Sequence, residues 1–111
     1  MPIKIVGNFS PNVVKLHIAG RSLEAFADIC TGLDITGRAY YTKDVPECYE
    51  YGKCDLNITV EFYSSFYNPK SEGDLLNDAL KVAQKCCKEH LTTTFHIETK
   101  YSITTYNYVR D

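Results

Sequence analysis

The clearest pattern in the sequence is the strict alternation of apolar and polar side chains in residues 56–63. The apolar side chains occupy every second position, so they share one face of an extended chain, as in a strand with one buried side. The apolar positions are Leu56, Ile58, Val60 and Phe62, and the polar positions are Asn57, Thr59, Glu61 and Tyr63. This segment is the strongest predicted strand of the chain.

Residues 14–18 alternate in the same way, with Lys15 and His17 on the polar side. They follow Ser10-Pro11-Asn12, a cluster of turn-forming residues. The stretch before this turn is also apolar at Ile3, Ile5 and Phe9. The pattern therefore predicts a first hairpin with one buried face.

Two segments have the three- and four-residue spacing of apolar side chains that is typical of helices. The first follows Ser22, a good N-cap, and we expect it to end at Gly32. The second spans residues 72–91 and follows Ser71, which lies three residues before Asp74, as in a capping box. Its apolar stripe consists of Leu76, Ala79, Leu80, Ala83, Cys87 and Leu91.

Three segments remain. Residues 34–42 predict a short strand, and residues 43–55 predict an irregular connection. Residues 92–109 are rich in Thr, Tyr, Ile and Val and contain no glycine or proline. We expect one or two strands there, with a break near Lys100.

This order of elements predicts an α+β fold, a two-layer sandwich in which a mainly antiparallel sheet carries two helices on one face. With 111 residues, the chain has the length of one compact domain, which buries roughly 65% of the surface that the unfolded chain exposes. We therefore expect residues 1–111 to form a single α+β domain with one core.

Charge and hydropathy narrow the class of protein. Twelve Lys and Arg residues against fourteen Asp and Glu residues give a formal net charge of -2. Nucleic-acid-binding proteins normally carry a basic surface, so a nucleic-acid partner is not expected. No stretch approaches the ~20 apolar residues of a membrane span, and residues 1–7 lack a secretory signal pattern. We expect a cytoplasmic protein that does not enter a membrane.

The five cysteines are an odd number in a chain long enough to form a core, which favours reduced thiols over a disulfide framework. Cys86 and Cys87 lie on the second predicted helix, and His90 follows Cys86 by one turn. A thiol beside an imidazole is the beginning of a nucleophile-base pair, but no third orienting group is identifiable. Buried or half-buried structural thiols are favoured, and a thiol enzyme is a distant third hypothesis.

A zinc site or a disulfide would involve Cys48 and Cys54. Together with Cys86 or Cys87 and His90, they would supply suitable zinc ligands. Five residues separate Cys48 from Cys54, however, whereas structural zinc sites prefer two to four. The two cysteines could equally close a disulfide loop in an oxidising environment. We expect neither a metal nor another cofactor.

No catalytic motif stands out. His17 and His96 occupy polar positions of predicted strands, where a lone histidine is usually an ordinary surface residue. The chain has no glycine-rich phosphate-binding loop, nucleophile elbow or zinc-protease helix. The sequence therefore predicts that the protein is not an enzyme.

The composition is notable for nine tyrosines and no tryptophan. Tyrosine offers a large contact area with a polar end and is enriched in binding surfaces, although it is also a common strand residue. The predicted partner-binding residues are Tyr49, Glu50, Tyr51, Tyr101, Tyr106 and Tyr108.

These observations favour a non-enzymatic binding module, of the kind of a small inhibitor or an immunity or counter-defence protein, that binds a macromolecular partner, most readily a protein. This class is an analogy from size, acidity and tyrosine content. The alternative is a protein that binds a small nucleotide-like or aromatic ligand in a pocket lined by tyrosines and basic residues. The basic candidates are Arg21, Arg38 and Lys43.

Self-association is the last expectation. If residues 92–109 form an edge strand or hairpin, their unpaired backbone groups can pair with another chain. The part between Tyr101 and Val109 contains no charged residue that would prevent this. We therefore predict a symmetric homodimer with Tyr101, Tyr106 and Tyr108 among its contacts. The competing hypothesis is a monomer in which this run is a central strand.

Overall fold

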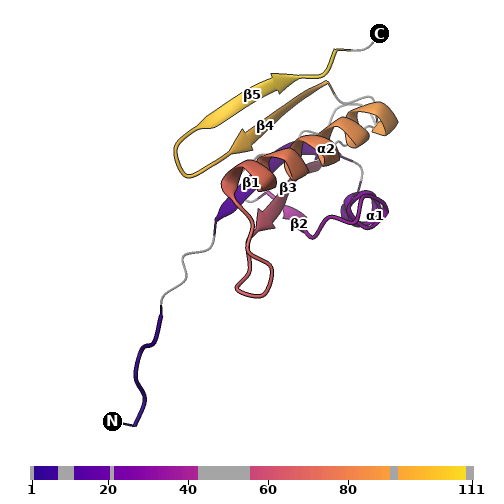
Figure 1. The fold of residues 1–111 in the computed structure, drawn as a ribbon. Coiled ribbons are helices and arrows are strands. Elements are labelled where there is room, and N and C mark those ends of the chain that lie inside the picture. The colour runs from indigo at the N-terminus through magenta and orange to yellow at the C-terminus, as the bar shows by residue number, and fades with distance from the viewer. Residues whose placement is uncertain (1, 8–11, 21, 43–55, 91–92, 110–111) are drawn as a thin grey trace.

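The computed structural model describes residues 2–7, 12–20, 22–42, 56–90 and 93–109. Five strands and two helices follow one another along these parts of the chain (Figure 1). In chain order they are β1 (Val13–Gly20), α1 (Leu23–Gly32), β2 (Arg38–Tyr41), β3 (Leu56–Tyr63), α2 (Glu72–His90), β4 (Thr94–Glu98) and β5 (Ile103–Asn107). The strands form one sheet in the order β2-β3-β1-β4-β5, and every neighbouring pair is antiparallel.

β1 is the central strand and determines which side chains are buried. It pairs with β3 along its whole length and with β4 over Lys15 to Ile18. Val14, Leu16 and Ile18 are buried in the core, while the residues between them point to the opposite face. Because side chains alternate along a strand, burial of these three residues requires Lys15 and His17 to lie on the other face.

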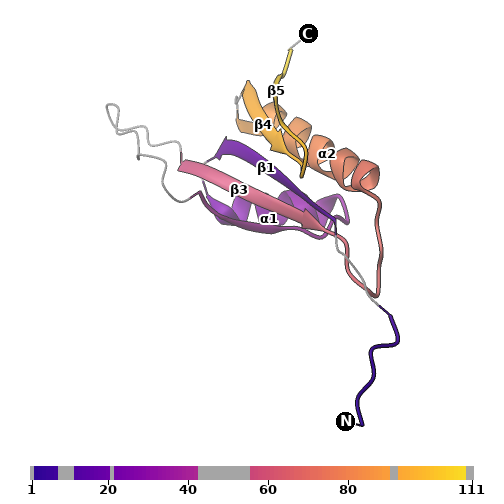
Figure 2. The ribbon, with the colours of Figure 1, turned by 90° about the vertical axis from the view of Figure 1, so that its left-hand side faces the viewer.

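Both helices cover the buried face of the sheet (Figures 1 and 2). Helix α1 contributes Phe26 and Ile29 to the core, and α2 packs mainly against β1. The residues that α2 buries completely, or almost so, are Leu75, Ala79, Val82, Ala83, Cys86 and Cys87. The opposite face of the sheet carries no helix among the described residues.

Local hydrogen bonds define the helix ends. The Ser22 hydroxyl accepts a hydrogen bond from the Ala25 backbone N–H at 3.2 Å, and Ser71 does the same for Asp74 at 3.1 Å. Both serines therefore act as the N-caps that the sequence predicts. After α1 the chain turns at Asp34, which has a left-handed φ of 56°. Asparagine and aspartate tolerate this conformation better than most other non-glycine residues.

The predicted fold class is confirmed: the protein is an α+β sandwich with five antiparallel strands in one sheet and two helices. The bounds predicted for β3 agree with the structure, and the break near Lys100 separates β4 from β5. The predicted strand before the first turn is wrong in the described residues 2–7, which have no regular secondary structure. Alternating apolar residues form a strand only where a neighbouring strand pairs with them.

Within the described parts of the chain, neither helix combines the length and the hydropathy that crossing a membrane requires.

A glycine substitution tests the packing of α1 on the sheet. A Cβ atom at Gly20 would lie 2.4 Å from the ring of the buried Phe26. We expect Gly20→Ala to lower the free energy of unfolding by about 1–3 kcal/mol, because the ring and its neighbours must shift. Gly32→Ala is the control, since a Cβ there meets nothing within 4 Å. Equal urea-unfolding midpoints for the two variants would contradict this packing.

Candidate active site

The uncovered face of the sheet gathers ionisable side chains from three adjacent strands. This open face carries Lys15 and His17 from β1, Thr59 and Glu61 from β3, and Glu98 from β4. The Cα atom of Lys15 pairs with those of both Glu61 and Glu98, and that of His17 pairs with that of Thr59. Antiparallel neighbours of this kind have Cβ atoms about 5 Å apart, so their polar groups can interact.

His17 connects the strands on either side of it. Its Nδ1 lies 3.0 Å from the Thr59 hydroxyl, and its Nε2 lies 3.0 Å from Oε1 of Glu98. Thr59 is only 1% exposed, and its hydroxyl also contacts the Thr42 hydroxyl at 2.6 Å. A neutral imidazole protonated at Nε2 satisfies the row: it donates to Glu98 and accepts from Thr59, which accepts from Thr42. The row holds the imidazole in one orientation.

Glu61 has its own partners on the β2 side of the open face. The Tyr40 hydroxyl donates to Oε1 of Glu61 at 2.6 Å, and Nζ of Lys15 lies 3.9 Å from the same oxygen. Burial, reinforced by the hydrogen bond to Glu61, raises the pKa of Tyr40 to about 12. Tyr40 therefore remains a hydrogen-bond donor to this carboxylate at neutral pH.

Two hollows include residues of the open face in their lining, and the second also reaches Glu72 at the start of α2. The larger, about 410 Å³, is lined by His17, Ile18, Ala19, Thr42, Asn57, Thr94 and His96. The other, about 360 Å³, is lined by Asn12, Val13, Lys15, Glu72, Glu98, Thr99 and Lys100. His17 lines the first and Glu98 the second, and the two side chains are hydrogen-bonded to each other. Volumes of this order suit a small organic ligand.

The arrangement supports binding of a cation, because Glu61 and Glu98 place two carboxylates on this face. A hydroxyl, an imidazole and a carboxylate in a row also occur in hydrolases that use serine as a nucleophile. Here the hydroxyl of Thr59 is buried, so the row orients the histidine and does not present a nucleophile to a substrate.

The tyrosines predicted to bind a partner differ in how far they are exposed. Tyr101 is exposed, with Nζ of Lys100 4.9 Å from its ring centroid. Tyr106 stacks on the buried Phe95 with ring centroids 5.3 Å apart, and Tyr108 also packs partly against the core. Tyr49, Glu50 and Tyr51 lie outside the described residues, as do Arg21 and Lys43. Arg38, the remaining basic candidate, is exposed at the start of β2. The partner-binding set therefore stays a prediction.

The cysteine candidates do not form a reactive site in the described residues. Cys30, Cys86 and Cys87 are buried in the core, and Cys30 and Cys86 are free thiols. Burial, with smaller contributions from Cys87 and Glu89, raises the pKa of Cys86 to about 12, so it is a thiol and not a nucleophilic thiolate at neutral pH.

The other parts of the cysteine hypotheses lie outside what can be described. Cys48, Cys54 and the side chain of His90 are outside the described residues, which leaves the zinc and disulfide alternatives as predictions. Within the described residues, no three His, Cys, Asp or Glu side chains are grouped so that they could hold a metal ion.

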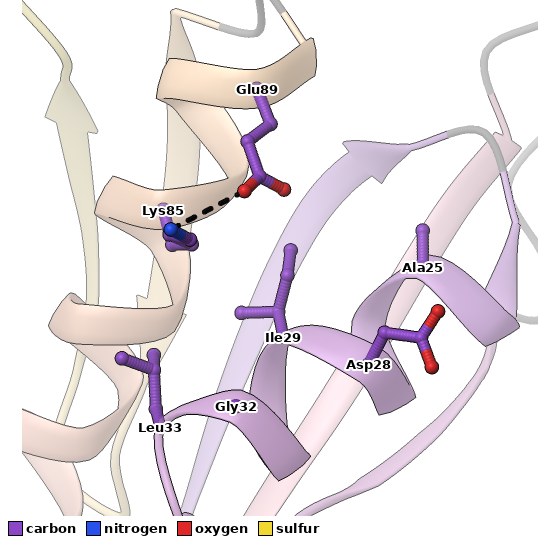
Figure 3. A pocket seen from close by; sticks show the side chains of 7 residues that line it. All are labelled: Ala25, Asp28, Ile29, Gly32, Leu33, Lys85 and Glu89. Carbon is purple, nitrogen blue, oxygen red and sulfur yellow. Dashed lines mark ion pairs between the residues drawn. The ribbon is translucent and has the colours of Figure 1, made fainter.

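A third hollow lies on the helical side of the molecule (Figure 3). It is about 350 Å³ and is lined by Ala25, Asp28, Ile29, Gly32, Leu33, Lys85 and Glu89. Lys85 and Glu89 pair with each other across one helical turn at 3.4 Å. The lining of this groove between α1 and α2 contains no histidine, and its two carboxylates are exposed to solvent. The open face, which combines a histidine with partly buried carboxylates, is therefore the better candidate for an active site.

No protein-family model and no curated protein sequence matches this chain. Two solved structures resemble it. A phage S-adenosylmethionine lyase in the apo state has 7% sequence identity and a TM-score of 0.56 over 100% of this chain and 99% of that chain. A phage S-adenosylmethionine lyase in complex with S-methyl-5'-thioadenosine has 9% identity and a TM-score of 0.52 over 95% of this chain and 97% of that chain. At such low identity the likeness establishes a common fold.

This finding contradicts the prediction of a non-enzymatic inhibitor or binding module. The solved structures that share the fold over nearly their whole length are enzymes. The prediction that the protein is not an enzyme is contradicted on the same ground, and the small-ligand-binding alternative also finds no support. The error lay in treating the lack of a familiar motif as evidence against catalysis, although catalytic groups that meet only in the fold leave no motif.

Sequence reasoning also misjudged His17, which is not an ordinary surface residue because both of its ring nitrogens have partners. Glu61 and Tyr40 were not among the candidates. The sequence does contain one indication of this site: the polar positions of the alternating segments 14–18 and 56–63 include the ionisable residues Lys15, His17 and Glu61. Such a concentration on one sheet face indicates a site, but only the pairing of the strands shows which groups meet.

The raised pKa of Tyr40 makes a pH-dependent prediction. An unfolded tyrosine ionises at about pH 10, whereas folded Tyr40 does so at about 12. The hydrogen bond to Glu61 therefore stabilises the fold fully below pH 10, and this stabilisation is lost as the pH rises through 12. We expect the difference in Tm between the wild type and Tyr40→Phe to shrink from pH 10 to pH 12. A difference that stays constant from pH 8 to pH 12 would contradict the contact.

Proposed function

We propose that this protein is a lyase that cleaves a carbon–sulfur bond of S-adenosylmethionine, or of a closely related sulfonium nucleoside, and releases S-methyl-5'-thioadenosine. The observation that supports this proposal is the fold shared with two phage S-adenosylmethionine lyases, one of which binds that thioether. A fold alone does not determine a function, so the chemistry of the open face has to be suitable as well.

The charges of the open face suit such a substrate. S-adenosylmethionine carries a sulfonium and an ammonium group, both positive, and the open face presents the carboxylates of Glu61 and Glu98. Attraction between opposite charges near a protein surface is on the order of several kcal/mol at contact distance before screening. The aromatic ring of Tyr40, held beside Glu61, offers a further favourable contact for a cation.

The charge that changes during the reaction determines where a carboxylate is useful. When the carbon–sulfur bond breaks, its electron pair remains on sulfur and the sulfonium charge disappears. A carboxylate in contact with sulfur would thus stabilise the substrate more than the transition state, which slows cleavage. We therefore assign Glu61 to the ammonium group, which keeps its charge throughout, and Tyr40 to positioning Glu61.

His17 occupies the neighbouring part of the same face. Its hydrogen bonds to Thr59 and Glu98 engage both ring nitrogens, so we assign His17 to holding the carboxylate of Glu98 in place and not to accepting a proton from the substrate. Water is not a reactant in a lyase reaction, so the carbon that loses sulfur gains its new bond within the substrate: either a bond to the substrate's own carboxylate oxygen, which releases no proton, or a double bond, with a proton passing to the solvent. Either way, cleavage leaves the thioether and a carbon fragment without added hydroxyl. We also propose a cytoplasmic location, because the buried Cys30 and Cys86 are free thiols.

The test is incubation of the purified protein with S-adenosylmethionine, followed by mass spectrometry of the products. We expect S-methyl-5'-thioadenosine and an unhydrated carbon fragment. Glu61→Gln should lower kcat/KM by about 10–100-fold, since a charge-assisted hydrogen bond contributes about 1.5–3 kcal/mol.

Asp28→Asn is the matched control, because it replaces a carboxylate by an amide in the groove between the helices. It should keep wild-type kcat/KM. Absence of the thioether with the wild type would refute the proposed reaction. Equal activity of Glu61→Gln and Asp28→Asn would refute the position of the site.

A further inference from the structure

Residues 2–7 form an arm whose apolar side chains are not covered by the fold. Ile3, Ile5 and Val6 are 79%, 91% and 100% exposed, and the arm leads away from the sheet (Figures 1 and 2). A Cβ placed at Gly7 would meet nothing within 4 Å. Three β-prone side chains in six residues, exposed to this extent, are costly to leave in water and mark an interaction segment.

The sheet has an edge that this arm can pair with. The N–H of Thr99 donates to Ser102 and that of Tyr108 donates to Thr93, which defines the hydrogen-bonded pairs of the β4–β5 ladder. Since such pairs alternate in an antiparallel ladder, the N–H groups of Ile103, Thr105 and Asn107 face outward from the sheet. β5 is the last strand of the described sheet, so this row is open to another strand.

β5 also lacks the features that keep edge strands from pairing. It contains no charged residue and no proline, and its Ile103 is 64% exposed. The opposite edge, β2, has only four residues and carries Arg38, so it is shorter and charged. Long uncharged edges are the ones that accept an added strand.

We propose that the arm of one copy of this chain adds to the outer edge of β5 in a second copy as a sixth strand. Residues 2–7 are enough to pair with the five residues of β5. Ile3 and Ile5 fall on one face of such a strand and can pack beside Ile103, while Lys4 points to the other face.

The second copy is favoured over the arm's own sheet for a topological reason. The arm precedes β1, which lies at the centre of the sheet, and it would have to cross β4 and β5 to reach their outer edge. It extends instead away from the sheet (Figure 1). If two copies exchange arms, the assembly closes as a twofold dimer. The homodimer expected from residues 92–109 thus keeps β5 as its contact but pairs it with the arm.

Light scattering at micromolar concentration tests whether the arm holds two copies of the chain together. We expect the wild type to have a mass of at least two chains of 12.6 kDa, and the double variant Ile3→Glu, Ile5→Glu to have the mass of one. Lys4→Glu is the matched control and should keep the assembly, because it changes charge on the other face of the strand. A monomeric wild type, or a double variant of unchanged mass, would overturn the proposal.

A second pair of variants tests whether the outer edge of β5 is where the arm binds. Thr105→Pro removes an outward-facing N–H that the β4–β5 ladder does not use, whereas Thr105→Val removes only the hydroxyl that contacts His96. We expect the proline variant alone to dissociate, with circular dichroism confirming that both are folded. If the arm variant dissociates and the folded proline variant does not, β5 is not the acceptor. The measured masses do not depend on catalysis, so this proposal and the proposed lyase activity can fail independently of each other.

Discussion

The burial of one sheet face beneath two helices is the constraint on which the rest of this structure depends. β1 lies between β3 and β4, and its Val14, Leu16 and Ile18 are buried in the core. Strand alternation then requires Lys15 and His17 to lie on the open face, and a register slip of one residue would exchange the two sets. The same hydrophobic burial that stabilises the fold therefore positions the polar groups.

The partners of His17 follow from that register. Thr59 and Glu98 are 42 and 81 residues away from it in sequence, yet each lies 3.0 Å from one of its ring nitrogens. The neighbouring carboxylate of Glu61 is held by Tyr40 from the next strand. A rigid sheet places these groups more exactly than a loop could.

The success and failure of sequence reasoning have the same physical origin. The central strands and both helices were predictable because their periodicities are local and their caps lie a few residues away. The contacts of His17 were not, because they depend on strand order, which is set by packing across the whole chain. The arm shows the converse: Ile3 and Ile5 alternate like a strand, but the described chain offers them no neighbour.

If the proposed lyase reaction is correct, the substrate occupies the open face. A crystal structure grown with S-methyl-5'-thioadenosine tests it most directly, since that thioether is bound by one of the lyases that share the fold. We expect the ligand on the open face, in contact with Glu61 or Tyr40 and adjacent to His17. A ligand bound in the groove between α1 and α2, against Asp28 and Ile29, would contradict it.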